Sequence, residues 1–218
     1  MTVHLSARGL GCERDDRWLF ADLTFSLAAG ELCRVEGPNG SGKTTLLRIL
    51  SGQLGDYSGE LHWCGERLDR HAKALRGELL YLGHRAGIKA GLSALENLAW
   101  YQALGEYRCD DAEAARWRAL ERVGLAGLEE LPVERLSAGQ QRRVALARLH
   151  LERRALWILD EPFTAIDAAG VAQLEGWMAE HRDAGGSVLV TSHHPLELDG
   201  AMARICLDGR GGHDVIAA

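Results

Sequence analysis

The chain has 218 residues, 46% of them hydrophobic and 26% charged, and its formal net charge is −6. This length supports one substantial core, so we expect a single domain spanning residues 1–218. Proteins that bind DNA or RNA usually carry a basic surface, so the acidic balance argues against a nucleic-acid partner. The arginine pairs at 142–143 and 153–154 are interpreted as solvated helix faces.

Five cysteines occur without a C-x-x-C pair, which argues against a disulfide framework or a zinc site and predicts reduced, mostly buried thiols. They are Cys12, Cys33, Cys64, Cys109 and Cys206. The first ten residues lack the layout of a signal peptide, and no run approaches the roughly 20 apolar residues that cross a bilayer. We therefore expect any membrane association to come through a partner.

The first predicted elements are two strands and a helix. Leu19–Leu27 alternates like a strand of an antiparallel piece, and Ala28–Gly30 forms the turn after it. Glu31–Glu36 is a predicted strand that leads through a glycine-rich turn into Lys43–Leu50, which has helical spacing. This order is typical of an α/β protein with an N-terminal antiparallel β piece.

The glycine-rich turn matches G-x-x-x-x-G-K-[ST] between a strand and a helix, the context that the motif requires. Its glycines let backbone N–H groups close around phosphate, and the following helix N-terminus adds partial positive charge. Lys43 would reach the β and γ phosphates of ATP, and the Thr44 hydroxyl would bind Mg²⁺. The flanking elements disfavour a chance turn. The predicted phosphate-binding residues are Gly37, Pro38, Asn39, Gly40, Ser41, Gly42, Lys43, Thr44 and Thr45.

Three helices are predicted in the middle of the chain. A capping box at Ser93 places a helix up to Leu104, and a second helix spans about Asp110 to Val123. A further capping box at Ser137 opens the third helix. The stripe expected on the second helix consists of Trp117, Leu120 and Val123, and the face expected on the third consists of Val144, Ala147 and Leu151. We expect a helical lobe over residues 87–154 within an α/β core of residues 1–86 and 155–218.

Two apolar runs, Ala155–Leu159 and Ser187–Val190, are predicted buried parallel strands. Asp160 and Glu161 end the first, where Asp160 would hold Mg²⁺ and Glu161 would orient and deprotonate the attacking water. His193 follows the second strand as a candidate γ-phosphate sensor. Solvated acids and an ordinary surface histidine are the alternatives, which the phosphate loop upstream disfavours.

The phosphate loop, Leu136–Gln140, Asp160–Glu161, Asp167 and His193 in this order resemble the motifs of ATP-binding cassette (ABC) ATPases. The resemblance covers the whole chain. It implies a P-loop NTPase cassette with a mainly parallel core sheet and an inserted α-helical subdomain. It also implies a homodimer in which the second motif of one subunit contacts ATP held by the other. The residues predicted to make this trans contact are Ser137, Ala138, Gly139, Gln140 and Asp167.

Within that family the chain is most similar to the ATPases of cytochrome c biogenesis, the haem-exporter group. The stretches that carry this similarity are Cys12–Arg17, Leu82–Lys89, Ala94–Leu98 and Trp157–Asp167. The similarity implies membrane permease subunits of the cytochrome c maturation system as partners, and a location on the cytoplasmic face of the bacterial inner membrane. ATP hydrolysis would then drive haem export or release of a haem-loaded chaperone.

Two positions depart from the family pattern. Arg85 stands where ABC proteins usually carry a glutamine, and arginine has no acceptor atom with which to bind Mg²⁺ or take a proton from water. Arg14 occupies the approximate position of the usual adenine-stacking aromatic residue. Trp18 is the nearest aromatic candidate for the adenine contact, with packing at the start of its strand as the alternative.

Three other functions stay open at this point. The chain could be the ATPase of a different ABC transporter, because the ATP motifs do not distinguish transporters. It could be a soluble ABC protein acting on nucleic acid, although a single acidic cassette disfavours this role. It could also be an ATP-binding switch with negligible hydrolysis, because Glu161 favours catalysis whereas Arg85 leaves it open.

Overall fold

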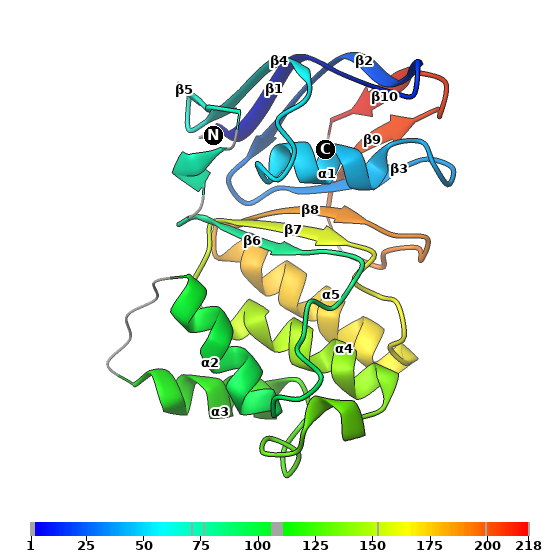
Figure 1. The fold of residues 1–218 in the computed structure, drawn as a ribbon. Helices are drawn as coiled ribbons and strands as arrows, with labels where there is room; N and C mark the ends of the chain where they lie inside the picture. Colours follow the sequence, from blue (N-terminus) through cyan, green and yellow to red (C-terminus); the bar gives the residue numbers. More distant parts are fainter. Residues whose placement is uncertain are drawn as a thin grey trace. The chain divides into compact units, whose positions relative to one another are not determined.

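The computed structural model describes residues 3–70, 72–75, 77–105, 111–151, 153–198 and 200–217 (Figure 1). Cys109 and Asp110, the predicted first residue of the second helix, lie outside these ranges. The chain forms two compact units. Unit 1 consists of Met1–Tyr81, Arg154–Glu161 and Leu174–Ala218, and unit 2 consists of Leu82–Arg153 and Pro162–Gln173. The domain boundaries expected from the sequence stay a prediction.

Unit 1 contains a four-stranded antiparallel sheet with the order β2-β1-β4-β5. Its strands are β1 (Val3–Arg14), β2 (Arg17–Ala28), β4 (Ser58–Trp63) and β5 (Glu66–Arg67). Side chains along β2 alternate between buried and exposed, which is why the period-2 pattern predicts this strand. The strand is longer than the expected Leu19–Leu27, since pairing with β1 extends it at both ends.

The second sheet has six strands in the order β10-β9-β3-β8-β7-β6. They are β3 (Leu32–Glu36), β6 (Leu79–Leu82), β7 (Leu156–Asp160), β8 (Ser187–Thr191), β9 (Ala203–Leu207) and β10 (His213–Ile216). β3 pairs in parallel with β8 and β9, β7 pairs in parallel with β8, and β10 is antiparallel to β9. Every residue of β7 and β8 is buried, as continuous apolar runs predict for central parallel strands. The expected α/β class is confirmed.

Helix α1 (Lys43–Leu50) supplies the centre of the unit 1 core and has the predicted bounds. It lies between the two sheets (Figure 1). One buried cluster joins its Leu46 and Leu47 to Phe20 of the antiparallel sheet and to Ile158 and Leu189 of the parallel-rich sheet. Burial of these side chains on both faces of α1 fixes the helix, and with it the loop that precedes it.

Unit 2 is helical. It contains α2 (Ala94–Leu104), α3 (Ala112–Arg122), α4 (Ala138–Leu146) and short 3-10 turns at Val133–Arg135 and Ala147–His150. Both predicted capping boxes are present, at Ser93 and at Ser137. Two expectations are wrong in part: Trp117 is 38% exposed, and the helix opened by Ser137 tightens into a 3-10 turn at Ala147.

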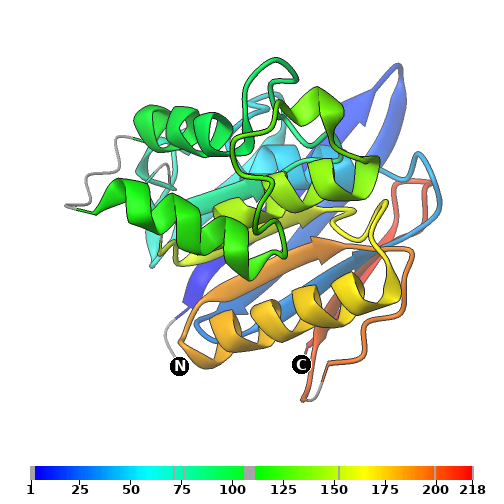
Figure 2. The ribbon, with the colours of Figure 1, turned by 90° about the horizontal axis from the view of Figure 1, so that it is seen from below.

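Helix α5 (Ala168–Asp183) and strands β1, β4, β5, β6, β9 and β10 have no counterpart in the sequence-based expectations. The part of α5 in unit 1 packs on β7, where the His181 ring stacks on Trp157 with ring centroids 3.9 Å apart. Figure 2 shows this C-terminal part of α5 running alongside the strands. Gly186 must be glycine here, because a Cβ would come within 2.2 Å of His181 Nε2.

Candidate functional site

The loop between β3 and α1 has a backbone that only glycine adopts freely. Gly37, Gly40 and Gly42 have φ angles of 143°, 76° and 102°. A Cβ on Gly37 would lie 2.3 Å from the Leu207 carbonyl oxygen. Side chains at these positions would either strain the backbone or displace β9, so the loop depends on its glycines.

Lys43 and Ser41 are the side chains of this loop that turn toward its own backbone or are buried. Lys43 Nζ donates to the carbonyl oxygens of Gly37 and Pro38, at 2.7 and 3.1 Å. Ser41 is 1% exposed, and its Oγ has no hydrogen-bond partner among the described residues. An ammonium group and an unpartnered hydroxyl beside the N-terminus of α1 form a binding site for anionic oxygens. Thr44 and Thr45 stand half-buried in the first turn of α1.

The carboxyl ends of three adjacent strands bring the predicted catalytic residues together. β3, β8 and β7 are neighbours in this order, and they lead into the glycine-rich loop, His193 and Glu161 respectively. In open α/β sheets ligands bind at this edge of the sheet. The glycine-rich loop, Asp160, Glu161 and His193 all belong to unit 1.

Asp160 ends β7 and is 1% exposed. Its Oδ1 accepts a hydrogen bond of 2.8 Å from Thr191 Oγ1, whereas its buried Oδ2 has no hydrogen-bond partner among the described residues. A buried carboxylate oxygen without a partner is costly unless a cation or a donor reaches it. A hard oxygen ligand of this kind fits Mg²⁺, as the sequence predicts for this position.

Glu161 is held in an unusual backbone conformation, with φ at 49°. This left-handed region costs a residue with a Cβ on the order of 1–2 kcal/mol. Its N–H donates to Thr191 Oγ1 at 2.9 Å, and its Oε2 accepts from the His193 N–H at 3.3 Å. His193 Nε2 lies 3.5 Å from Glu161 Oε1, so the structure places the predicted base and the predicted sensor side by side.

Thr191 is the site residue that sequence reasoning missed. Its single hydroxyl donates to Asp160 and accepts from Glu161, and the residue is fully buried. The parallel register places Thr191 opposite Asp160. The signal in the sequence was a polar residue at the end of the apolar run Ser187–Val190, whose partner is known only once β7 and β8 are paired.

The second predicted motif lies in unit 2 and is a helix start. Ser137 Oγ accepts from the Gln140 N–H at 3.3 Å, and Gln140 Oε1 accepts from the Ser137 N–H at 2.9 Å. Ser137 and Ala138 are exposed. A Cβ on Gly139 would come within 2.9 Å of the Ala165 carbonyl oxygen, so the helix start and the segment before Asp167 touch.

Asp167 is fixed in the same unit. Its Oδ1 accepts from the Gly170 N–H at 3.0 Å and from Arg143 Nη2 at 3.1 Å. The Gly170 N–H and then the Arg143 guanidinium hold the pKa of Asp167 below its usual value. The predicted trans-contact residues are thus brought together, whereas Arg85 is exposed on the segment that follows β6.

The expectation of a solvated arginine pair at 142–143 is wrong. Arg142 is 5% exposed, and it donates to the carbonyl oxygens of Pro162 and Gly83 at 3.1 and 3.4 Å. The helix places Arg142 toward two backbone segments of unit 2, and a guanidinium has enough N–H donors to bind a carbonyl group of each. Of the thiols expected to be mostly buried, Cys12 and Cys33 are buried, Cys206 is half-buried and Cys64 is exposed in the β4–β5 turn.

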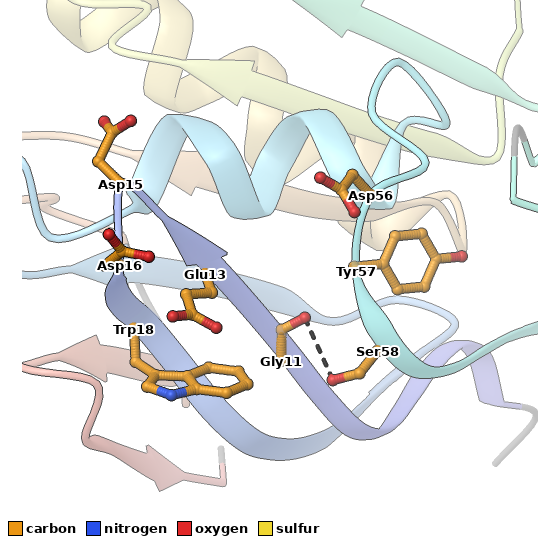
Figure 3. Close-up of a pocket in the computed structure, with 8 residues that line it drawn as sticks. All are labelled: Gly11, Glu13, Asp15, Asp16, Trp18, Asp56, Tyr57 and Ser58. Atoms are coloured by element: carbon orange, nitrogen blue, oxygen red, sulfur yellow. Dashed lines mark hydrogen bonds between the residues drawn. The ribbon is translucent and has the colours of Figure 1, made fainter.

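A pocket of about 550 Å³ opens on the antiparallel sheet of unit 1 (Figure 3). Trp18 pairs with Glu13 across β1 and β2, its ring lies beside Gly11, and the residue is 45% exposed. Trp18 is therefore not a packed core residue. Arg14 is exposed and does not line the pocket. The lining residues are Gly11, Glu13, Asp15, Asp16, Trp18, Asp56, Tyr57 and Ser58.

Comparison with known proteins agrees with this arrangement. The ABC transporter family model matches residues 20–164. The cytochrome c biogenesis ATP-binding export protein CcmA of Pseudomonas putida is 54% identical over 197 residues, which cover 90% of this chain and 92% of that protein. The CcmA protein of Hahella chejuensis is 52% identical over 206 residues, covering 94% and 96%.

Solved structures of ATP-binding cassettes share the fold. A dimeric post-hydrolysis cassette bound to ADP and Pi has a TM-score of 0.83 at 19% identity, covering 98% of this chain and 99% of that one. The ADP conformation of a cassette of an ABC transporter has a TM-score of 0.82 at 17% identity, covering 100% and 91%. In the part of the chain that the structure describes, no helix is long and apolar enough to cross a membrane. The glycine-rich loop, the strand-end carboxylates and these matches together show that the chain belongs to the ABC transporter family, among the cytochrome c biogenesis ATP-binding export proteins CcmA.

Proposed function

We propose that the chain is the ATP-binding and hydrolysing subunit of a membrane ABC complex for cytochrome c maturation. The observation that carries the ATPase part is the meeting of the glycine-rich loop, Asp160, Glu161 and His193 at three adjacent strand ends. The process is inferred from relatives that are 50–54% identical and are named for cytochrome c biogenesis.

Phosphate binding falls to the glycine-rich loop. The backbone N–H groups of residues 37–45 surround the phosphates, and Lys43 gives up its carbonyl contacts with Gly37 and Pro38 to reach the β and γ groups. The Thr44 hydroxyl and the buried Oδ2 of Asp160, which has no hydrogen-bond partner among the described residues, would hold Mg²⁺. The ion supplies positive charge that offsets the charge on the phosphate oxygens.

Water activation falls to Glu161. Its carboxylate accepts the proton of the attacking water, and the left-handed backbone together with the Thr191 hydrogen bond fixes its direction. His193 lies against the same carboxylate and contacts the γ-phosphate. Because His193 and Glu161 are in contact, binding of the γ-phosphate by His193 also affects the position of the Glu161 carboxylate.

We infer that two copies form a homodimer with one ATP between each glycine-rich loop and the partner's helix start. Ser137, Ala138, Gly139 and Gln140 present a capped helix N-terminus, and Asp167 is held beside it by Arg143. Such a helix end binds anions through backbone N–H groups. An arrangement of this kind is self-complementary, which suits the twofold symmetry of most homodimers.

The proposed partners are the permease subunits of the cytochrome c maturation system, at the cytoplasmic face of the inner membrane. Closure of the dimer on ATP and reopening after hydrolysis would drive haem export or release of the haem-loaded chaperone. Arg85 stays the proposed counterpart of the glutamine that ABC proteins usually carry at this position. Arg14 and Trp18 stay the proposed adenine contacts, and Trp18 is the one whose ring is available for stacking.

The deciding experiment measures ATP binding and ATP hydrolysis of Glu161→Gln beside wild type. Hydrolysis should fall at least about 100-fold because the general base is lost, while ATP affinity stays within about 2-fold. Glu66→Gln, on the exposed strand β5, is the matched control and should change neither. Hydrolysis that survives in Glu161→Gln would refute the assigned base.

The proposed role in cytochrome c maturation is tested separately by isolating the native complex in mild detergent and identifying its subunits. Recovery of membrane subunits of the cytochrome c maturation system supports the proposal. Recovery of a different permease would place the chain in another transporter, and would leave the ATPase assignment intact.

A further inference from the structure

Arg17, the first residue of β2, ties two distant segments of unit 1 together. Its Nη2 donates to the Gly209 carbonyl oxygen at 2.7 Å and to the Gly40 carbonyl oxygen at 3.3 Å. Gly40 belongs to the phosphate-binding loop, and Gly209 belongs to the turn between β9 and β10. A guanidinium is suited to this task because its Nη2 carries two N–H groups and can donate to two carbonyl groups at once.

The turn that Arg17 reaches is itself tightly built. Asp208 Oδ1 accepts from the N–H groups of Arg210 and Gly212, at 2.6 and 2.9 Å, and the Asp208 N–H donates to the Gly212 carbonyl at 3.1 Å. The turn is joined to β2 by a hydrogen bond of 3.1 Å from the Ala21 N–H to the Gly211 carbonyl. Its shape is thus fixed without help from any ligand.

The same turn lies against the phosphate-binding loop. A Cβ on Gly209 would stand 3.3 Å from Pro38 Cγ and 3.5 Å from Ser41 Cβ, and a Cβ on Gly37 would strike the carbonyl of Leu207. The loop therefore packs against the end of β9 and against the turn that follows it. Arg17 adds a hydrogen bond to the loop and another to the turn.

The hydrogen bond from Arg17 to the Gly40 carbonyl orients the peptide group between Gly40 and Ser41. Because the peptide group is planar and trans, a hydrogen bond on the Gly40 carbonyl also orients the Ser41 N–H, which points to the Pro38 carbonyl at 3.2 Å. Gly40 has a φ of 76° and no atoms within 4 Å of a built Cβ, so its own packing does not hold it. Without the arginine, this glycine would sample more conformations.

We propose that Arg17 is a positioning residue for ATP, which braces the phosphate-binding loop against the Asp208–Gly212 turn before the nucleotide arrives. The proposal rests on the proposed ATPase function of the same loop. The brace raises the fraction of molecules whose loop is ready for phosphate, and an apparent dissociation constant scales inversely with that fraction. Arg17 contacts the loop backbone and acts on ATP through it.

The test is the dissociation constant for Mg-ATP and the kcat of the full chain carrying Arg17→Ala. Loss of a charged hydrogen-bond donor should weaken Mg-ATP binding about 10-fold. kcat at saturating ATP should stay within about 2-fold, since binding is lost equally in ground and transition states. Arg210→Ala is the matched control: it removes an exposed arginine from the same turn, while the Arg210 N–H still binds Asp208. It should leave the affinity within about 2-fold.

A second variant separates positioning from charge. Asp208→Ala removes the acceptor that shapes the turn, and it should weaken ATP binding in the same direction although it removes a negative charge. The double variant Arg17→Ala, Asp208→Ala should be no weaker than the worse single variant, because both changes release one brace. Thermal unfolding without nucleotide checks that each variant is folded, and Asp208→Ala carries the test if Arg17→Ala is not.

The possible results distinguish failure of the proposed ATPase function from failure of the proposed role of Arg17. Wild type that neither binds nor hydrolyses ATP overturns the proposed function. Wild type that binds ATP, with equal losses in Arg17→Ala and Arg210→Ala, overturns the brace alone and assigns the effect to charge. A fall of kcat in Arg17→Ala with unchanged affinity also overturns it, as do additive losses in the double variant.

Discussion

Thr191 offers the sharpest test of the site, because one hydroxyl holds both the Asp160 carboxylate and the Glu161 backbone N–H. Thr191→Val replaces that hydroxyl by a methyl group of similar size, so the packing of β8 between β3 and β7 is kept. Asp160 then loses its donor at 2.8 Å, and the Glu161 N–H loses its acceptor at 2.9 Å. The Asp160 carboxylate stays where water reaches it poorly, since the residue is 1% exposed.

The expected cost follows from these two bonds. A hydrogen bond to a charged group contributes about 1.5–3 kcal/mol, and a neutral backbone bond contributes about 1 kcal/mol. We therefore expect Thr191→Val to lower the free energy of unfolding by about 2–4 kcal/mol. With urea slopes of about 2–3 kcal/mol per molar, the unfolding midpoint falls by on the order of 1 M.

The assay is urea unfolding of the nucleotide-free chain, together with ATP turnover. Thr191→Ser keeps the hydroxyl and loses one methyl group, so it should cost only about 1 kcal/mol. Turnover of Thr191→Val should fall about 10- to 100-fold, because misdirected catalytic groups lose rate steeply. Equal destabilisation by Val and Ser would refute the reasoning, as would unchanged turnover in Thr191→Val.

Two further predictions concern Arg85 and His181. Arg85→Gln should preserve or raise ATP turnover, because glutamine supplies the acceptor that arginine lacks; a collapse of turnover would show that the arginine has a catalytic role of its own. Burial lowers the pKa of His181 from 6.5 to about 4, so the unfolded chain binds the proton more readily, and stability is full above pH 6.5 and falls as the pH drops toward 4. Allowing for solvent screening of the partly exposed ring, His181 should account for about 1 kcal/mol of the stability lost between pH 7 and pH 5. His181→Phe keeps a ring on Trp157 and should flatten the pH dependence of the unfolding midpoint; an unchanged slope would contradict the assignment.

Features that depend on residues close together in the sequence were predictable from it. The helix Lys43–Leu50 has its predicted bounds because a glycine-rich turn starts it and Ser51–Gly52 ends it. The capping boxes at Ser93 and Ser137 are present because their partners stand three residues away. The same holds for the buried runs of β7 and β8, where continuous apolar sequence predicts burial on both faces.

Features that depend on distant partners were not predictable. The role of Thr191 depends on its register with Asp160, and the surroundings of Trp18 depend on the pairing of β1 with β2. Arg142 is buried because backbone carbonyls of Gly83 and Pro162 converge on it from two other segments. None of these neighbours is visible in a window of sequence.

The place of β3 in the sheet has a consequence for how the protein is made. β3 ends at Glu36, yet its two neighbours begin at Ser187 and Ala203. A ribosome-bound chain that has not yet reached Ser187 holds the strand before its phosphate loop with neither partner. Pairing between strands far apart in the sequence is slow, because the entropy of loop closure is lost before the favourable contacts form. Newly made chains should therefore acquire their ATP site only after β8 and β9 have been synthesised.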